Sequence, residues 1–427
     1  MTPRGPSEER GVFIGSGGFG VDSRRAVAVL RERQLALESE DAALAWVRLA
    51  AHAGATRAVL AWESGGFELR FDGAPLPAVL LSRPYDAYLG SMDADALMRQ
   101  FGLALLHLAR PGVDIALTAG PARARRAVYF RGPAADPPVA VEDGRDDTVV
   151  KAVWQPPAKP RKGHPETWDL HALADRLDAC PMPVTLVHRG KTRVIQTWSR
   201  RFGREAWVSE ADGLRCGVHI FAECERGTSL QLCLAGVSVE RERLDGLPVP
   251  ADAWVDSLEF RLNASLTRVV KGPPRERARH AGMAALAEAF PAALARHGKL
   301  MKLSAALLKR KPSLIAHWER AMDAGFRDTG RGARARRKSE MGFFRRPSSD
   351  VFLLEDAALW TVAWRRALRL AQDEKIAPAF SAFCDALPSA PLAFTRDFDL
   401  VSPDSGLRAV PWSQADAKYL NLRKKRA

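Results

Sequence analysis

The sequence predicts a multidomain protein of α/β and α+β class, with a mainly helical C-terminal region. The chain has 427 residues. A single domain usually takes roughly 150 residues, so we expect two or three domains. Alternating helix and strand patterns give way to a proline-rich stretch, then to strand-like runs, and finally to long helical periods. We therefore expect units at 1–131, 167–272 and 273–427, joined after the first by a linker at 132–166.

The first clear helix is expected in the stretch SEDAALAWVRLAAHAGAT, which begins at Ser39. Ser39 is a suitable N-cap, and the two acidic residues after it favour the positive end of a helix. Leu44, Val47 and Ala51 recur at helical spacing and form one apolar face. Gly54 then ends the helix.

The next stretch, RAVLAWESGGFELRFDG, is expected to form a β-hairpin with one buried face. Phe67, Leu69 and Phe71 alternate with Glu68 and Arg70 after a Gly-Gly pair. Alternation of this kind places the aromatic and aliphatic side chains on one side of a strand, and two glycines suit a tight turn.

The stretch RQFGLALLHLARPGVDIAL, residues 99–117, predicts a helix followed by a short strand, with Gly102 inside the helix. Glycine in a helix interior costs roughly 1 kcal/mol relative to alanine, so it usually marks a close backbone approach, a cap or a ligand. Two explanations stay open for Gly102: a position that faces a phosphate, or close packing of the helix on a sheet.

The remaining units follow from their patterns. In region 167–272 a helical stretch, TWDLHALADRLDAC, precedes strand-like runs that include PVTLV, TRVIQTW, SLQLCLAGVSVE and AWVDSLEF, which predicts an α+β unit. Region 273–427 contains alanine- and leucine-rich stretches at helical period and is predicted to be mainly helical. The linker at 132–166 is rich in prolines and charges and has little periodicity.

The chain is basic, with a formal net charge of +14 and a pI near 9.9. Much of this charge lies late, in an arginine-rich segment at 329–349 and in the C-terminal tail. Such a segment either contacts the phosphates of a nucleic acid or forms a solvated loop. The residues that would contact nucleic acid are Arg334, Arg336, Arg337 and Lys338.

Several function classes are disfavoured. No stretch approaches the roughly 20 apolar residues of a membrane span, and the first residues are too polar for a signal peptide, so we expect a cytoplasmic protein without membrane association. The five cysteines and the scattered histidines show no ligand spacing, so we expect no metal site. The GSGGFG run at 15–20 lacks the GK[ST] ending of a phosphate loop and is interpreted as a turn.

Three motifs between residues 22 and 270 resemble those of the GHKL ATPases and occur in the same order. The run AHAGATRAVLAWESGGFELRFDG is similar to the helix-to-hairpin segment of MutL, whose helix ends in DAGAT. Gln100, Phe101 and Gly102 resemble the QFGxGxxSA motif of the ninety-kilodalton heat-shock chaperones. The run AWVDSLEFRLNASLTRVV resembles VDSxDLPLNxSR of the chaperone middle domain, and CPMPVTLVHRG resembles the opening of that domain.

This resemblance implies a GHKL-like α/β sandwich, with helices on a mixed sheet, followed by a chaperone-middle-like α+β domain of the ribosomal-S5 type. It also implies a nucleotide site. Leu266 occupies the place of the family arginine that reaches the γ-phosphate, and Arg268, on the same strand face, would be the phosphate contact instead. The residues implied in nucleotide binding are Asp72, Gly73, Gln100, Phe101 and Gly102.

The catalytic positions depart from the family pattern. With the AGAT motifs aligned, the carboxylate that activates water falls on Ala45, and the asparagine that holds Mg²⁺ falls on Leu49. Neither side chain can perform these tasks. We therefore expect no catalytic residue and no required cofactor, and we expect a chaperone-like protein that acts by binding a protein partner.

Two alternatives stay open. A functional ATPase of the heat-shock type would bind ATP and Mg²⁺, with Asp72 and Gly102 as surviving parts of its site. A nucleic-acid-binding protein would use the basic segment at 329–349. The resemblance to the chaperones also implies a homodimer.

Overall fold

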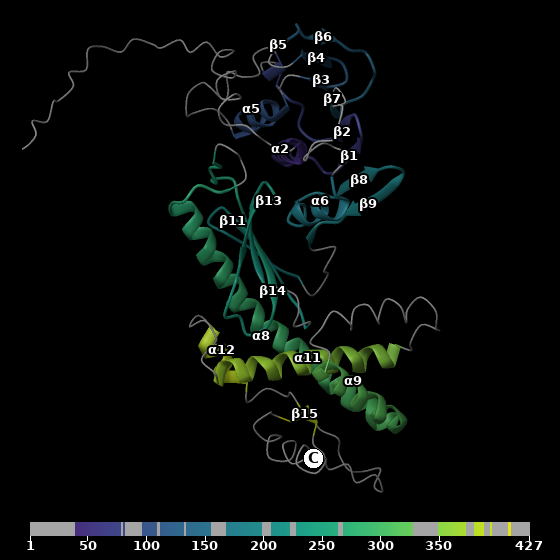
Figure 1. The fold of residues 1–427 in the computed structure, drawn as a ribbon, viewed down its shortest axis with the longest axis vertical. Helices are drawn as coiled ribbons and strands as arrows, with labels where there is room; N and C mark the ends of the chain where they lie inside the picture. Colours follow the sequence, from purple (N-terminus) through teal and green to yellow (C-terminus); the bar gives the residue numbers. More distant parts are fainter. Residues whose placement is uncertain are drawn as a thin grey trace, which may run out of the picture.

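The computed structural model contains two main β-sheets and a set of long helices (Figure 1). The mixed α/β class predicted from the sequence is confirmed at this level. No helix in the described part of the chain is long and apolar enough to cross a membrane. The structure describes residues 39–77, 80–81, 96–108, 112–131, 134–154, 168–198, 206–222, 228–263, 268–327, 349–372, 380–387, 393–394 and 409–410.

The first sheet has nine strands, and most of its neighbours run antiparallel. Its order is β5-β4-β3-β7-β2-β1-β8-β9, and β6 also pairs with β4. Among the described pairs, β1 and β8 are parallel. The strands are β1 (Ala58–Glu63), β2 (Gly66–Phe71), β3 (Val113–Ala119), β4 (Arg126–Arg131), β5 (Ala134–Ala135), β6 (Val139–Ala140), β7 (Thr148–Trp154), β8 (Val184–His188) and β9 (Lys191–Ile195).

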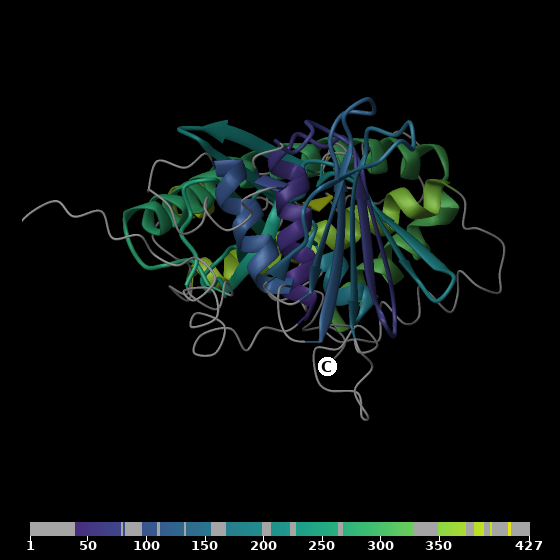
Figure 2. The same cartoon turned by 90° about the horizontal axis from the view of Figure 1, so that it is seen from above.

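Two helices cover one face of this sheet. Helix α2 (Ser39–His52) and helix α5 (Ala96–Leu108) lie side by side on it, as Figure 2 shows. The rings of Trp46 and Phe101 join them edge to face, with centroids 5.8 Å apart. The predicted hairpin is confirmed: β1 pairs with β2, and Phe67, Leu69 and Phe71 are buried in the core below the helices.

The opposite face of the first sheet, which we call the open face, carries exposed side chains. They occupy alternate positions of the strands and point away from the helices, and several of them are aliphatic or aromatic. Large apolar residues exposed on this face include Val59, Tyr129, Val153 and Val194, with exposed fractions of 36%, 49%, 43% and 48%.

The first sheet extends further along the chain than predicted. The expected linker at 132–166 contains β7, which lies between β2 and β3 in the middle of the sheet, so a linker over that whole range is wrong. The PVTLV and TRVIQTW runs were expected in the second unit, but they form β8 and β9 beside β1. The unit boundary therefore lies after residue 198 rather than at 167.

The second sheet has five strands in the order β10-β11-β14-β12-β13. The helix α8 (Pro273–Arg310) packs on one face of it and comes close at Gly282, where an added Cβ would lie 2.8 Å from Leu230 Cδ1. Every residue of β12 is buried, so this sheet, unlike the first, is covered on both faces there. The strands are β10 (Ala206–Ala211), β11 (Leu214–Ile220), β12 (Ser229–Leu234), β13 (Val237–Arg243) and β14 (Ala251–Ser257).

Helices dominate the described part of the C-terminal region. The second half of α8 packs with helix α9 (Ile315–Arg327) and helix α11 (Ser349–Gln372) around a small apolar core. Helix α12 (Ser381–Ala386) adds Cys384 and Leu387 near the second sheet's core. Helix α6 (Leu170–Arg176) lies away from these helices, between β8 and β13.

Candidate functional site

Helix α2 carries the two positions where the GHKL resemblance expects catalytic groups. Ala45 and Leu49 lie on it and are 2% and 0% exposed. All side chains from residue 41 to residue 50 are buried, because α2 lies between the sheet, α5 and the edge of the second sheet. Neither methyl nor isobutyl can activate water or hold a cation. No group of three or more acidic, cysteine or histidine residues in the described ranges could hold a metal ion.

Asp72 follows β2 and binds the loop that leaves α2. Its Oδ1 accepts hydrogen bonds from the backbone N–H groups of Thr56 at 2.7 Å and Arg57 at 3.0 Å, and its Oδ2 accepts one from Thr56 Oγ1 at 2.6 Å. Burial acts to raise the pKa of Asp72, but these hydrogen bonds and the Arg57 charge outweigh it and lower that pKa. Both carboxylate oxygens are therefore engaged in joining β2 to the start of β1.

Gly73 extends the same contact. It has a φ of +108°, and a Cβ there would lie 2.8 Å from both Ala53 O and Ala55 N. The neighbouring Ala74 N–H donates to Ala53 O at 2.8 Å. The turn after β2 thus lies directly on the backbone at the end of α2, a close approach that only glycine permits.

Gln100, Phe101 and Gly102 are consecutive residues of α5. Phe101 is 0% exposed and points at Trp46 of α2. Gly102 is buried and is the seventh residue of α5, so its N–H belongs to the hydrogen-bond ladder of the helix rather than to the free N-terminal turn. Gly102 is thus a buried residue of the helix interior, and its implied role in nucleotide binding stays a prediction.

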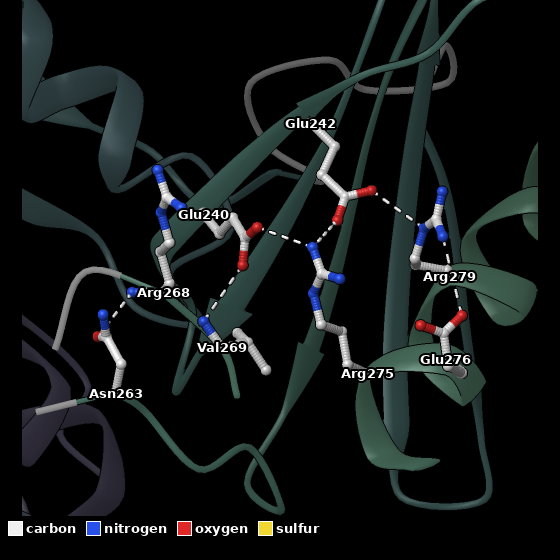
Figure 3. A network of polar contacts seen from close by, with 8 residues as sticks. All are labelled: Glu240, Glu242, Asn263, Arg268, Val269, Arg275, Glu276 and Arg279. Carbon is white, nitrogen blue, oxygen red and sulfur yellow. Dashed lines mark hydrogen bonds and ion pairs between the residues drawn. The ribbon is translucent and has the colours of Figure 1, made fainter. Parts of the chain in front are cut away.

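Arg268 precedes α8 and lies beside an isolated antiparallel bridge between Leu262 and Val269. Its N–H donates to Asn263 Oδ1 at 3.1 Å, and Asn263 N–H donates to the Arg268 carbonyl at 2.9 Å (Figure 3). The side chain of Arg268 is exposed. The next residue, Val269, is bound to β13, because its N–H donates to Glu240 Oε2 at 3.2 Å.

An ion-pair network beside this bridge anchors α8 to β13 (Figure 3). Arg275 Nη2 lies 2.8 Å from Glu240 Oε1 and also contacts Glu242. Arg279 Nε lies 3.0 Å from Glu242 Oε2, and its Nη1 lies 3.7 Å from Glu276 Oε2. The network fixes the first turns of α8, where carboxylates are also favoured by the helix dipole.

The two units meet at a junction, which we define as the contact between α2, α6 and the β12–β13 hairpin. Arg176 of α6 spans it: Nη1 lies 2.7 Å from Asp41 Oδ1 of α2, and Nε donates to the Ser238 carbonyl at 3.4 Å. Val237, the first residue of β13, is fully buried in the core of the first unit. The hairpin of the second sheet therefore inserts into the first unit.

The turn between β12 and β13 binds Asp256 of β14, which in turn binds Arg215 of β11. Arg215 Nη2 donates to the Ala179 carbonyl at 2.9 Å and to Asp256 Oδ2 at 3.1 Å, and its guanidinium lies 5.2 Å from the ring centre of Trp254. Gly236 N–H donates to Asp256 Oδ1 at 2.8 Å. Burial raises the pKa of Asp256, although the Gly236 and Arg215 hydrogen bonds oppose that shift.

Sequence reasoning missed the junction. Its residues and those that hold its turn lie on α2, α6, β11, β13 and β14, and no local spacing connects Asp41 with Arg176 or Arg215 with Asp256. The Ala-Gly pair between two apolar runs at 230–239 is a hairpin signal that was available. The GSGGFG run and the basic segment, with Arg334, Arg336, Arg337 and Lys338, lie outside the described residues.

No protein-family model matches the chain, and no curated protein matches it. Among solved structures, it is similar to the B-subunit of the DNA gyrase from Myxococcus xanthus, with 14% identity and a TM-score of 0.43, over 60% of this chain and 93% of that chain. It is also similar to the 43K ATPase domain of Thermus thermophilus gyrase B in complex with an aminocoumarin, with 12% identity and a TM-score of 0.38, over 64% of this chain and 95% of that chain. These similarities concern the fold, and the activity and the ligand named for the second structure belong to that protein.

Proposed function

We propose that this chain is a GHKL-like protein that does not hydrolyse ATP and acts by binding a protein partner. The observation that carries the first part is the burial of Ala45 and Leu49 in α2, at 2% and 0% exposure. Hydrolysis needs a group that activates water and a ligand for Mg²⁺, and this helix offers apolar side chains at both positions.

The engagement of Asp72 supports the same proposal. Its two oxygens already accept hydrogen bonds from Thr56 and Arg57. An adenine amino group would compete with these contacts for the same acceptors. The residue retained from the motif therefore has a role in the fold that explains its presence without a nucleotide.

The open face of the first sheet supports partner binding. It combines exposed apolar side chains, such as Tyr129 and Val153, with a few charges of both signs, such as Glu68 and Lys151. Exposed apolar groups gathered on one face are typical of protein interaction sites. The mixed charge favours a protein surface over the uniformly negative surface of a nucleic acid.

Steady-state phosphate release from Mg-ATP tests the first part. We expect the wild-type protein and Asp72→Asn to release phosphate at the same background rate. The asparagine side chain keeps an oxygen acceptor for the loop N–H groups, so the fold is expected to survive the change. Turnover well above background in the wild-type protein, lost in Asp72→Asn, would contradict the proposal.

Affinity capture with two baits tests the second part. The wild-type chain is compared with Tyr129→Glu/Val153→Glu, which places two charges on the open face without touching the core. We expect a protein that the wild-type chain retains and the variant does not, with unchanged circular dichroism. Identical captured sets from the two baits would remove the open face as the binding surface.

A further inference from the structure

Arg48 is an arginine buried inside the molecule at the junction. It lies on α2, one turn after Ala45, and its side chain is among the largest fully buried ones, at 1% exposure. Arg176 and Asp41 lie close enough to shift its pKa, as does the thiol of Cys233 on β12. The guanidinium is therefore surrounded by α2, α6 and the second sheet.

Its hydrogen-bonding capacity is not used up. Nε and Nη2 of Arg48 are buried and have no hydrogen-bond partner among the described residues. Asp41, the carboxylate whose charge raises the pKa of Arg48, already forms an ion pair with Arg176 at 2.7 Å. That carboxylate is therefore shared between the guanidinium groups of Arg48 and Arg176.

The charge on Arg48 persists at neutral pH. Burial lowers the pKa of its guanidinium to about 10, with the Arg176 charge acting in the same direction and Asp41 and Cys233 opposing it. A group with that pKa remains protonated at pH 7. A buried cation with unused donors is unfavourable unless an anion or another acceptor reaches it.

We propose that Arg48 binds a phosphate group at the junction, with Arg176 as the second cation. The guanidinium presents two N–H groups in a planar fork, which matches two oxygens of a phosphate. A bound phosphate would accept hydrogen bonds from Nε and Nη2 and would place a negative charge beside the guanidinium groups of Arg48 and Arg176. The phosphate is either free inorganic phosphate or part of a nucleotide.

This site does not depend on the proposed function. Its groups are Arg48 and Arg176, whereas the nucleotide site implied by the family resemblance uses Asp72, Gly102 and the positions of Ala45 and Leu49. A chain without ATPase activity can bind phosphate here, and a chain with ATPase activity can fail to do so.

Thermal unfolding of the full chain in two salts tests the proposal. We expect the Tm of the wild-type protein to rise in sodium phosphate relative to sodium chloride of equal ionic strength, because a ligand of the folded state stabilises it. Arg48→Met removes both donors and should abolish that rise. In sodium chloride its Tm should equal or exceed that of the wild type, since an unpaired buried charge has been removed.

A parallel titration with ATP and EDTA identifies the source of the phosphate. A rise with inorganic phosphate assigns a free ion, and a rise with ATP alone assigns a nucleotide; both require loss of the effect in Arg48→Met. If Arg48→Met does not fold, Arg48→Lys keeps the charge without the fork, and its phosphate affinity should be about tenfold weaker.

Arg125→Met is the matched control. The side chain of Arg125 is also 1% exposed and also has two buried donors, Nε and Nη1, without a hydrogen-bond partner, but two carboxylates balance its charge, Asp143 at 3.2 Å and Asp147 at 3.1 Å. This variant should keep the phosphate response. The proposal is overturned if phosphate and chloride give the wild-type protein the same Tm, or if Arg48→Met responds as the wild-type protein does.

Discussion

Three hairpins of this molecule share one turn geometry, yet their surroundings differ. The turns at Arg189–Gly190, Asp212–Gly213 and Ala235–Gly236 have φ values of 50°, 52° and 51° at the first residue and 74°, 72° and 75° at the glycine. A Cβ added to either of the first two glycines would meet no atom within 4 Å, whereas one added to Gly236 would lie 2.5 Å from Pro181 Cδ.

The difference separates local from long-range causes. Positive φ at both central residues is typical of a two-residue hairpin turn and follows from the nearby sequence. The contact of one turn with residues 179–181 follows from how the two units pack. The same kind of substitution can therefore be made at a packed residue and at an exposed one. The difference between the two losses in the free energy of unfolding measures how much the packing contributes to stability.

The largest expected effect is at the packed turn itself. Gly236→Ala introduces a methyl group at 2.7 Å from Ala179 O and at positive φ, and we expect a loss of about 3 kcal/mol in the free energy of unfolding. Gly213→Ala carries the backbone strain without the clash and should cost about 1 kcal/mol. Denaturant titration measures both, and equal losses would mean that the junction adds nothing to stability.

A smaller effect is expected from the buried histidine of α8. Burial lowers the pKa of His297 to about 3, from 6.5 in the unfolded chain. The folded state thus favours the neutral form of His297. Its contribution to the free energy of unfolding is fully present above pH 6.5 and is lost as the pH decreases towards 3. We expect a loss of about 2 kcal/mol between neutral pH and about pH 5.

His297→Gln should remove this part of the acid sensitivity. His280→Gln, at an exposed position of the same helix, is the matched control and should leave the pH profile unchanged. Denaturant titrations at several pH values provide the measurement. A wild-type protein equally stable at pH 7 and pH 5 would contradict the prediction.

The next comparison is between two arginines of α8, the partly buried Arg275 and the exposed Arg277. Arg275→Ala leaves two partly buried carboxylates, on Glu240 and Glu242, without their partner, and we expect a loss of about 1.5 kcal/mol. Arg277, on the same helix as Arg275, pairs with Glu259 at side-chain exposures of 57% and 59%. Arg277→Ala should therefore cost about 0.3 kcal/mol. Similar losses would show that burial of the network is unimportant.

The smallest effect is expected at Asp72. Hydrogen bonds lower its pKa against the effect of burial, so its carboxylate stabilises the fold above the unfolded value of 3.8 and this contribution is lost as the pH falls below it. Asp72→Asn should lose less than about 1 kcal/mol at pH 7, and the loss should become smaller as the pH falls below 3.8. A larger gap at low pH than at pH 7 would contradict the assigned role.

The parts of the fold that were predicted correctly depend on neighbours in sequence. The α2 helix and the hairpin at 58–71 follow from periodicity and alternation. Strand β7 was missed because prolines and charges surround Thr148–Trp154, although its burial alternates along the strand. Strand β8 was placed in the wrong unit because its parallel pairing with β1 spans more than a hundred residues.

For the candidate site too, some features could be predicted from neighbouring residues and others required the structure. The apolar character of Ala45 and Leu49 could be seen in the sequence. The role of Asp72 required the position of Thr56, and the burial of Arg48 required the packing of three elements at the junction. Pairings of this kind connect distant residues, and a single sequence carries no local signal for them.

The central claim is that the residues of α2 that would carry out catalysis serve the fold instead. Single-turnover phosphate release tests it most directly, with protein in excess over labelled Mg-ATP so that slow product release cannot hide a chemical step. The account predicts release at the rate of buffer alone in the wild-type protein. Release faster than buffer, abolished by EDTA, would contradict it.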